Sequence, residues 1–232
     1  MTWRALAYAP VVVPQALWVA ARAARLPEAA GPRQGVTGQG PGARVLVLGD
    51  SSAAGVGVRT QDQALGGRLA AEMAVRRRVD WTVLAKSGGT VRSTTALLET
   101  LGEAQFDGVV VALGVNDAKN RVSLRAWRDG YVALLDRLAV GFGARVICVS
   151  GLPPVRQFPL LPAPLNAVLG ERAERFDQDL RAIAEARRDT HYLPLTFTMD
   201  TAQMAEDGFH PGPQVYAEWA RRVAAVFERA GL

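Results

Sequence analysis

The sequence predicts one α/β domain of three layers, α/β/α, with helices on both faces of a parallel sheet of about five strands. Three observations predict this fold. From residue 44 onward, short β-branched runs alternate with longer amphipathic ones. The short runs are almost continuously apolar, as in strands buried on both faces. A length of 232 residues, with 49% hydrophobic and 21% charged residues, suits a single full-sized core.

The first 43 residues differ in composition from the rest of the chain. Residues 1–26 contain an uncharged apolar stretch, 5–21, which is short for a membrane span and includes Pro10 and Pro14. An export signal, a membrane anchor and an arm packed on the domain stay open, and with them an exported, membrane-associated or cytoplasmic location. Residues 27–43 carry five glycines and three prolines and predict an irregular linker, so the folded domain is expected over residues 44–232.

The expected strands cover residues 44–49, 80–85, 108–113, 145–150 and 191–195. Between the first two strands, Thr60 and Gln63 have the spacing of a capping box at the start of a helix. Large apolar residues at helical spacing mark four helices, which carry Leu65, Leu69 and Met73, then Leu124, Trp127, Tyr131, Leu134 and Leu138, then Leu165, Leu169, Phe176, Leu180 and Ile183, and finally Val215, Trp219, Val223 and Val226. Such stripes are typical of a core. Nothing in them indicates a cofactor.

Charge and cysteine content exclude several classes of function. The net charge is +5, but 25 of the 27 basic residues are arginines scattered singly, and only residues 76–78 form a cluster. That cluster closes an amphipathic segment, where cations favour the negative end of the helix dipole, so no nucleic-acid partner is expected. The single cysteine, Cys148, lies in an apolar run and is expected in the core. It excludes an intramolecular disulfide and a cysteine-rich zinc site.

Four fragments that follow predicted strands carry the chemically capable residues. They cover residues 49–52, 86–90, 114–117 and 207–211, which read Gly-Asp-Ser-Ser, Lys-Ser-Gly-Gly-Thr, Gly-Val-Asn-Asp and Asp-Gly-Phe-His-Pro. Each fragment alone is typical of a turn or a helix cap. Because ligands bind beyond the carboxyl ends of parallel strands, the four together predict one site at that edge of the sheet.

A serine nucleophile needs a base, and the sequence offers two histidines. His191 starts a predicted strand at the opposite edge of the sheet and is expected to be structural. His210 follows Asp207 by three residues, a spacing that lets the carboxylate reach the imidazole in one turn and orient it toward Ser51. Ser51, Asp207 and His210 are therefore the candidate catalytic triad.

The motifs Gly49-Asp50-Ser51, Gly88, Gly114-Val115-Asn116-Asp117 and Asp207-x-x-His210 resemble the four blocks of the SGNH hydrolase superfamily, the GDSL-like esterases and lipases. The resemblance extends from about residue 44 to the C-terminus. It implies a flavodoxin-like form of the α/β/α fold, with Ser51 as nucleophile, His210 as general base and Asp207 as the residue that orients His210.

The resemblance also implies an oxyanion hole built from the backbone N–H of Ser51, the backbone N–H of Gly88 and the side-chain amide of Asn116. Gly89 is an alternative donor to Gly88. Residues 86–87 are Lys-Ser where many members have asparagine before the glycine, which leaves the hydrogen bonds around Gly88 open. Asp50 and Asp117 are expected to hold loops through backbone hydrogen bonds and to stay outside the proton transfer.

The predicted function is hydrolysis of carboxylic esters through an acyl-enzyme on Ser51, with no metal or cofactor.

Residues 151–166 are rich in proline and large apolar groups and form either an acyl-binding wall, with Phe158, Leu160 and Leu161 as candidates, or a loop packed on its own core. The expected substrate is a small-molecule ester with an apolar acyl chain, which includes thioesters and lysophospholipids. An acyltransferase and a carbohydrate O-acetyl esterase are alternatives, whereas the intact triad argues against a non-catalytic binding module. Membrane contact through residues 5–21 stays open.

Overall fold

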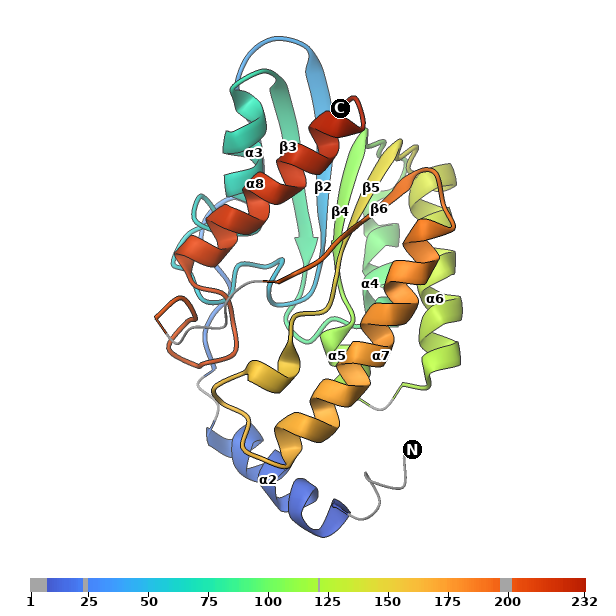
Figure 1. The fold of residues 1–232 in the computed structure, drawn as a ribbon. Coiled ribbons are helices and arrows are strands. Elements are labelled where there is room, and N and C mark those ends of the chain that lie inside the picture. The colour runs from blue at the N-terminus through green and yellow to red at the C-terminus, as the bar shows by residue number, and fades with distance from the viewer. Residues whose placement is uncertain (1–7, 23–24, 121, 197–201) are drawn as a thin grey trace.

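The computed structural model describes residues 8–22, 25–120, 122–196 and 202–232, which form a six-stranded sheet between two layers of helices (Figure 1). The strand order is β1-β3-β2-β4-β5-β6. The strands are β1 (Gln34–Thr37), β2 (Gly42–Gly49), β3 (Arg78–Ala85), β4 (Gly108–Ala112), β5 (Val146–Ser150) and β6 (Thr190–Leu193). Strands β2 to β6 are parallel, and β1 runs antiparallel to β3 at the edge.

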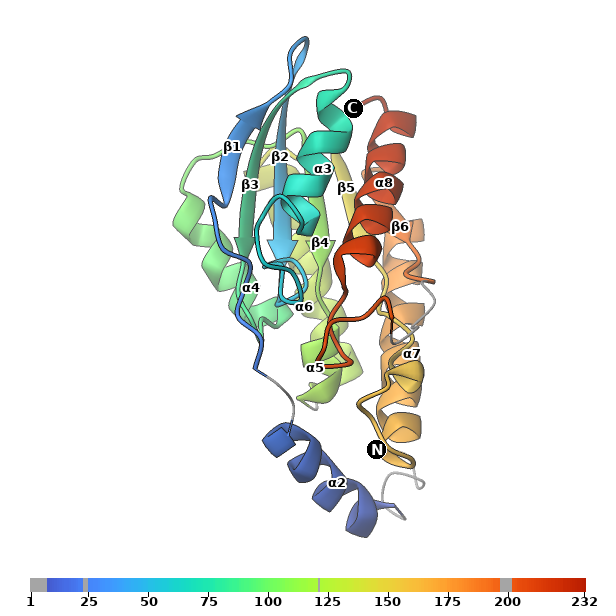
Figure 2. The same ribbon diagram turned by 90° about the vertical axis from the view of Figure 1, so that its left-hand side faces the viewer.

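Within the described residues, five helices cover the two faces of the sheet. Helices α3 (Leu65–Ala74) and α8 (Pro213–Arg229) pack on one face, and α4 (Val91–Leu98), α6 (Leu124–Asp136) and α7 (Leu165–Glu185) pack on the other, as Figures 1 and 2 show. The shorter elements are α5 (Val115–Lys119), η1 (Glu99–Leu101), η2 (Arg137–Gly141) and η3 (Val155–Gln157). The N-terminal helix α2 (Ala9–Arg22) lies outside the two layers. The predicted three-layer fold is therefore confirmed.

Strand β2 shows how the core is divided between the two faces. Its side chains alternate across the pleat. Val45 and Val47 belong to the core under α3 and α8, whereas Leu46 and Leu48 belong to the core under α4, α6 and α7. All four are at most 1% exposed, which explains why the strand reads as a continuous apolar run.

Two local predictions are wrong. Residues 27–43 were expected to be irregular, but residues 34–37 form β1 and pair with β3. The capping box at Thr60 does not form, because the helix begins at Leu65 and its N-cap, Ala64, has no capping side chain. The Gln63 side chain instead accepts a hydrogen bond from the backbone N–H of Arg59 at 3.3 Å.

Helix α2 packs against the segment that leads into α7. The Gln15 side chain donates to the carbonyl of Ala163 at 2.7 Å and accepts from the N–H of Leu165 at 3.1 Å. No residue of α2 is buried. Among the described helices, none is both long and apolar enough to span a membrane. Residues 1–7 and 23–24 of the predicted N-terminal segment lie outside the described residues.

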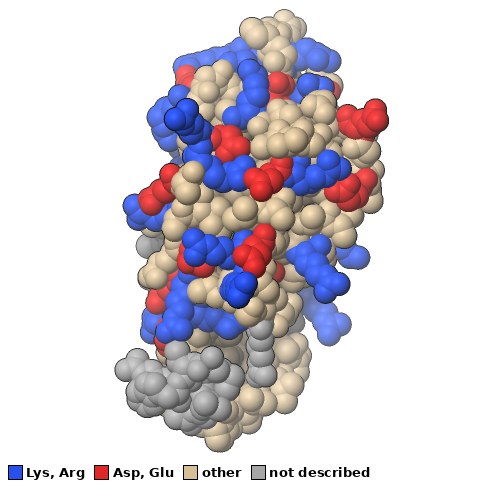
Figure 3. Space-filling model, turned by 90° about the vertical axis from the view of Figure 1, so that its right-hand side faces the viewer, with Lys and Arg blue, Asp and Glu red and all other residues tan. Residues whose placement is uncertain are grey.

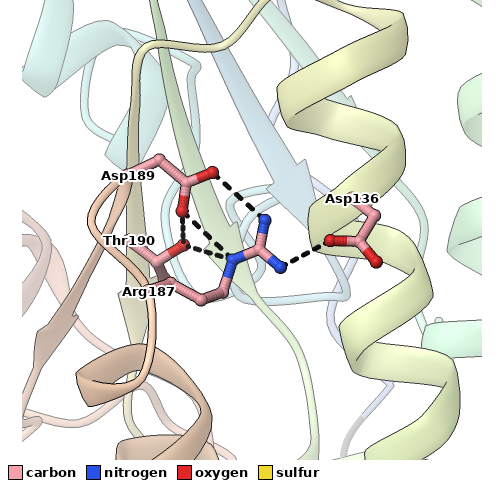
Figure 4. Close-up of polar contacts among 4 residues, drawn as sticks. All are labelled: Asp136, Arg187, Asp189 and Thr190. Atoms are coloured by element: carbon pink, nitrogen blue, oxygen red, sulfur yellow. Dashed lines mark hydrogen bonds and ion pairs between the residues drawn. The ribbon is translucent and has the colours of Figure 1, made fainter.

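Charged residues of both signs are interspersed on the face shown in Figure 3. Arg187 shows how such residues join elements, because its guanidinium contacts Asp136 of α6 at 2.5 Å and Asp189, just before β6, at 3.1 Å (Figure 4). Thr190 accepts a further hydrogen bond from the same guanidinium at 3.3 Å. This cluster ties α6 to the amino end of β6.

The carboxyl ends of the central strands lie level with one another. Gly49, the last residue of β2, is the register partner of both Ala85 in β3 and Ala112 in β4. A Cβ atom on Gly49 would lie 2.5 Å from the carbonyl oxygen of Ala112, so the close approach requires glycine. The loops that follow β2, β3 and β4 therefore start side by side.

Candidate active site

The loop after β2 presents Ser51 from a tight turn. The Asp50 carboxylate accepts the backbone N–H of Ser52 at 3.0 Å and its hydroxyl at 2.8 Å. The carbonyls of Asp50 and Ser51 accept the N–H groups of Ala54 and Val56. Side-chain and backbone hydrogen bonds therefore both fix this turn, and Ser51 lies half-buried at the start of the turn.

The loop before α8 holds Asp207 and His210 in one turn. The Asp207 carboxylate accepts the backbone N–H groups of Phe209 and His210, each at 2.9 Å, and lies 2.5 Å from Nδ1 of His210. Burial alone would raise the pKa of the Asp207 carboxyl, but the hydrogen bonds from His210 and Phe209 hold it below its ordinary value. Asp207 is therefore held as a carboxylate that accepts from the imidazole.

The structure brings these two loops together across 159 residues of sequence. Nε2 of His210 lies 2.9 Å from Oγ of Ser51, within hydrogen-bond distance. Gly57 allows the contact between the loops, because a Cβ atom there would lie 2.3 Å from the carbonyl oxygen of Pro211. Ser51, His210 and Asp207 thus form a continuous chain of hydroxyl, imidazole and carboxylate, which is the arrangement that activates a serine for attack.

The predicted oxyanion donors lie on the loops after β3 and β4. The Asn116 amide donates to Oδ2 of Asp50 at 3.2 Å and to the carbonyl of Gly89 at 3.0 Å. The N–H of Gly89 donates to the carbonyl of Lys86 at 2.9 Å. Neither the N–H of Ser51 nor that of Gly88 has an acceptor among the described residues. Of the two glycines, Gly88 is therefore the one with an N–H available for a ligand.

Asp50 and Asp117 are buried behind these loops. Burial raises the pKa of the Asp50 carboxyl. It also raises the pKa of Asp117, to about 6. The Asp117 carboxylate accepts the backbone N–H of Val91, the first residue of α4, at 3.1 Å. Both carboxylates thus accept backbone N–H groups of the loops, as expected from the sequence.

A cavity of about 70 Å³ opens beside the triad. Its polar lining consists of Asp50, Ser51, Ser52, Asn116 and His210, and its apolar lining of Val115, Pro153, Phe158, Leu195, Met204, Phe209, Pro211, Val215 and Trp219. Of the three acyl-wall candidates, only Phe158 lines the cavity. Leu161 is buried in the core under α7, and Leu160 lies outside the lining. Residues 151–166 therefore divide between the wall and the core.

Most of the apolar lining was not predicted as site residues. Val215 and Trp219 have helical spacing on α8, which predicted core, and they do pack in it while also reaching the cavity. The indole N–H of Trp219 donates to the Ser150 hydroxyl at 3.0 Å, at the end of β5. Phe209, Pro211 and Val115 have a local signal, because they lie within the sequence motifs that carry His210 and Asn116. Phe209 directly precedes His210. Its ring packs edge-on against Phe158 at 4.8 Å.

No cluster of histidine, cysteine and acidic side chains within the described residues could hold a metal ion. His191 lies in β6, where its register partner is Cys148 in the middle of β5. The other histidine, His210, has both ring nitrogens engaged, with Asp207 and Ser51.

Comparisons with known proteins identify the family and the fold of this chain. Residues 47–218 match the sequence model of the GDSL-like Lipase/Acylhydrolase family. Among curated proteins, sequence comparison finds no match.

Solved structures share the fold at low sequence identity. TesA is 22% identical, with a TM-score of 0.63, over 81% of this chain and 99% of that one. The psychrotrophic esterase EstA from a Pseudoalteromonas species is 19% identical, with a TM-score of 0.58, over 80% and 97%. Est24, a carbohydrate acetylesterase from Sinorhizobium meliloti, is 17% identical, with a TM-score of 0.62, over 81% and 99%.

The buried Asp117 carboxyl predicts a pH dependence of stability. Its pKa in the folded chain, about 6, exceeds the ordinary value of 3.8, so the folded state retains a proton that the unfolded state releases. This contribution to stability is present below about pH 4 and is lost as the pH rises through 6. A shift of about two pKa units corresponds to a loss of about 3 kcal/mol in the free energy of unfolding over this pH range.

Asp117→Asn keeps a carbonyl oxygen that can accept from Val91 but does not titrate. Urea unfolding of both proteins at intervals from pH 4 to pH 7 should show the wild type losing free energy of unfolding relative to the variant. If the free energy of unfolding changes equally with pH in the wild type and in Asp117→Asn, the prediction is wrong.

Proposed function

The chain belongs to the GDSL-like lipase/acylhydrolase family and is a carboxylic ester hydrolase, and on that premise we propose that Ser51 is its nucleophile, His210 its general base and Asp207 the residue that orients His210. The observation that carries the proposal is the pair of contacts at His210. Nε2 lies 2.9 Å from Oγ of Ser51, and Nδ1 lies 2.5 Å from the Asp207 carboxylate. A carboxylate on Nδ1 stabilises the tautomer whose Nε2 can accept the serine proton.

Acylation follows from these positions. His210 takes the Ser51 proton as Oγ attacks the ester carbonyl, and the carbonyl oxygen becomes an oxyanion. His210 then donates this proton to the alkoxide that leaves as the alcohol, so Ser51 carries the acyl group. A water molecule then attacks the acyl-enzyme as His210 takes one of its protons. His210 returns this proton to Oγ of Ser51 as the carboxylic acid is released.

The N–H groups of Ser51 and Gly88 and the amide of Asn116 are the proposed oxyanion donors. The two backbone groups have no acceptor among the described residues, which supports their role. The Asn116 amide is already engaged, and its longer bond, at 3.2 Å to Asp50, is the one that an oxyanion would share or replace. Donors held in place before the reaction stabilise charge as it develops.

The substrate class follows from the cavity. Its lining is apolar except beside the triad, which favours an apolar acyl group over a charged one. Its volume is about 70 Å³, roughly half that of an engineered cavity of about 150 Å³ that accepts benzene. We therefore infer a short acyl chain, from acetyl to about butyryl. Short esters include acetylated carbohydrates, the substrates named for Est24.

Helix α2 is a proposed membrane contact. It lies at the end of the molecule toward which the parallel strands run (Figure 1). Val11, Val13, Leu17 and Trp18 are 45–68% exposed on it, while Gln15 attaches the helix to the domain. The Arg22 guanidinium stacks on the Trp18 ring at 4.8 Å. Exposed apolar side chains beside arginine are typical of helices that lie in a lipid interface.

Ser51→Ala should abolish hydrolysis of p-nitrophenyl acetate, with kcat falling by about 10⁴-fold or more. Asn116→Ala should lower kcat by about 10²–10³-fold, because one oxyanion donor is lost. A fluorophosphonate should label the wild type and leave Ser51→Ala unlabelled. Ser123→Ala, which removes only the hydroxyl that caps α6, is the control and should retain activity. A wild type that neither turns over esters nor reacts with the fluorophosphonate excludes the proposed triad.

A series of p-nitrophenyl esters from acetate to palmitate tests the cavity. We expect kcat/KM to be highest for acetate to butyrate and at least about tenfold lower for octanoate, because each further methylene lacks space. Phe158→Leu enlarges the cavity and should move the optimum toward longer chains. Phe106→Leu, a buried phenylalanine that pairs with Phe142 away from the cavity, should leave the profile unchanged. A palmitate optimum would contradict the inference, and product transfer to an added alcohol in excess of hydrolysis would indicate an acyltransferase.

Co-sedimentation of the full chain with vesicles of phosphatidylcholine and phosphatidylglycerol tests the membrane contact. The double variant Leu17→Ser and Trp18→Ser should bind about tenfold more weakly, since burying either side chain contributes about 1.5–3 kcal/mol when complete and both are half-exposed already. Val140→Ser, an 86% exposed position in η2, is the control. Equal binding of the wild type and the double variant would exclude α2 as the contact.

A further inference from the structure

Residues 28–33, which we call the strap, lie outside the part of the chain that matches the family model, yet they contact two catalytic loops. On one side the strap is bound to the loop that follows Ser51. The N–H of Ala29 donates to the carbonyl of Ala54 at 3.2 Å, and the buried Gln61 amide donates to both of those residues' carbonyls at 3.1 Å. The nucleophile loop and the strap therefore form one hydrogen-bonded unit.

On its other side the strap is bound to the end of β3 and the loop that carries Gly88. The Glu28 carboxylate accepts the backbone N–H of Ser87 at 2.6 Å. Arg33 donates to the other oxygen of Glu28 at 2.5 Å and to the carbonyl of Ala85 at 2.8 Å. Glu28 and Arg33 thus hold the loop at two points, one of them immediately before Gly88.

The loop after β3 has little packing that could fix Gly88. Residues 86–88 are exposed, and a Cβ atom on Gly88 would meet no atom within 4 Å. Gly88 also has a φ of 79°, a conformation that costs glycine little and that packing does not enforce. The direction of its N–H therefore depends on hydrogen bonds to the neighbouring residues, and the bond from Ser87 to Glu28 is the nearest of these to come from a side chain.

We propose that Glu28 is a positioning residue, which aims the N–H of Gly88 at the developing oxyanion by holding the N–H of Ser87. This inference rests on the proposed assignment of Gly88 to the oxyanion hole. The role of Arg33 is electrostatic. A bare carboxylate close to the oxyanion would oppose its charge, and the Arg33 guanidinium neutralises Glu28 at 2.5 Å.

Three variants separate positioning from mere attachment of the N-terminal segment. Glu28→Ala removes the acceptor, Glu28→Gln keeps a carbonyl oxygen for Ser87 without the charge, and Arg33→Gln leaves Glu28 without its cation. Glu99→Ala is the matched control, because the Glu99 carboxylate also accepts two hydrogen bonds, both from Arg137 at 2.8–2.9 Å, away from the site. The readouts are kcat and KM for p-nitrophenyl acetate, thermal melting, and inhibition by a trifluoromethyl ketone, whose adduct with a serine carries an oxyanion.

We expect Glu28→Ala to lower kcat by about tenfold, less than the loss of a whole donor, with KM within twofold of the wild type. Its inhibition constant for the trifluoromethyl ketone should rise by a similar factor. Glu28→Gln should restore most of kcat. Arg33→Gln should lower kcat at low salt and recover in part as salt screens the carboxylate. Glu99→Ala should match the wild type in kcat.

Other results would overturn the inference. One is an unchanged kcat in Glu28→Ala. Another is an equal loss of kcat in Glu28→Ala and Glu28→Gln, because it would show that the effect does not depend on the hydrogen bond from Ser87. A third is a lower melting temperature with only KM altered. If Glu28→Ala does not fold, the comparison of Glu28→Gln with Arg33→Gln still decides, because the proposal requires the second to be slower. Fluorophosphonate labelling of Ser51 in the wild type separates these failures from failure of the triad itself.

Discussion

The register of the three central strands is the constraint on which the site depends. Gly49, Ala85 and Ala112 end β2, β3 and β4 at the same level, and glycine at position 49 is required by the nearby Ala112 carbonyl. A parallel strand that slipped by one residue would turn its buried side chains to the other face, so the core holds the register. The loops that carry the proposed nucleophile and the proposed oxyanion donors therefore start side by side because the apolar core holds the strands in register.

Hydrogen bonds to buried carboxylates take over where the strands end. Asp50 holds the turn of Ser51, Asp117 holds the start of α4, and Asp207 holds the turn of His210. Burial opposes the charge of all three carboxyls, yet only the pKa of Asp207 falls, since its partner is an imidazole as well as two backbone N–H groups. The carboxylate that contacts His210 is thus the one whose charge the fold supports most strongly.

The sequence predicted those parts of the molecule whose signal is local. The strands are continuous apolar runs, and the spacing from Asp207 to His210 lies within one turn, so both were recognisable. Strand β1 was missed because its four residues, Gln-Gly-Val-Thr, have no apolar alternation and form a strand only by pairing with β3. Apart from Phe158, most of the apolar lining of the cavity was missed for a similar reason. Trp219 and Val215 follow the period of a core helix, and only the packing of α8 against the end of β5 brings them beside Ser51.

Different kinds of contact hold the proposed catalytic residues and the residues that line the cavity. Ser51, His210 and Asp207 lie on two short loops, and hydrogen bonds within a few residues of these side chains fix each loop. The cavity beside Ser51 is lined by residues that only tertiary contacts bring together, namely Pro153 and Phe158 after β5, Leu195 after β6, Phe209 beside His210 and Trp219 on α8. Substitutions at these apolar positions can therefore change the space for an acyl chain while Ser51, His210 and Asp207 keep their contacts. For this reason the reaction type is recognisable from short motifs, whereas the acyl group requires the packed structure.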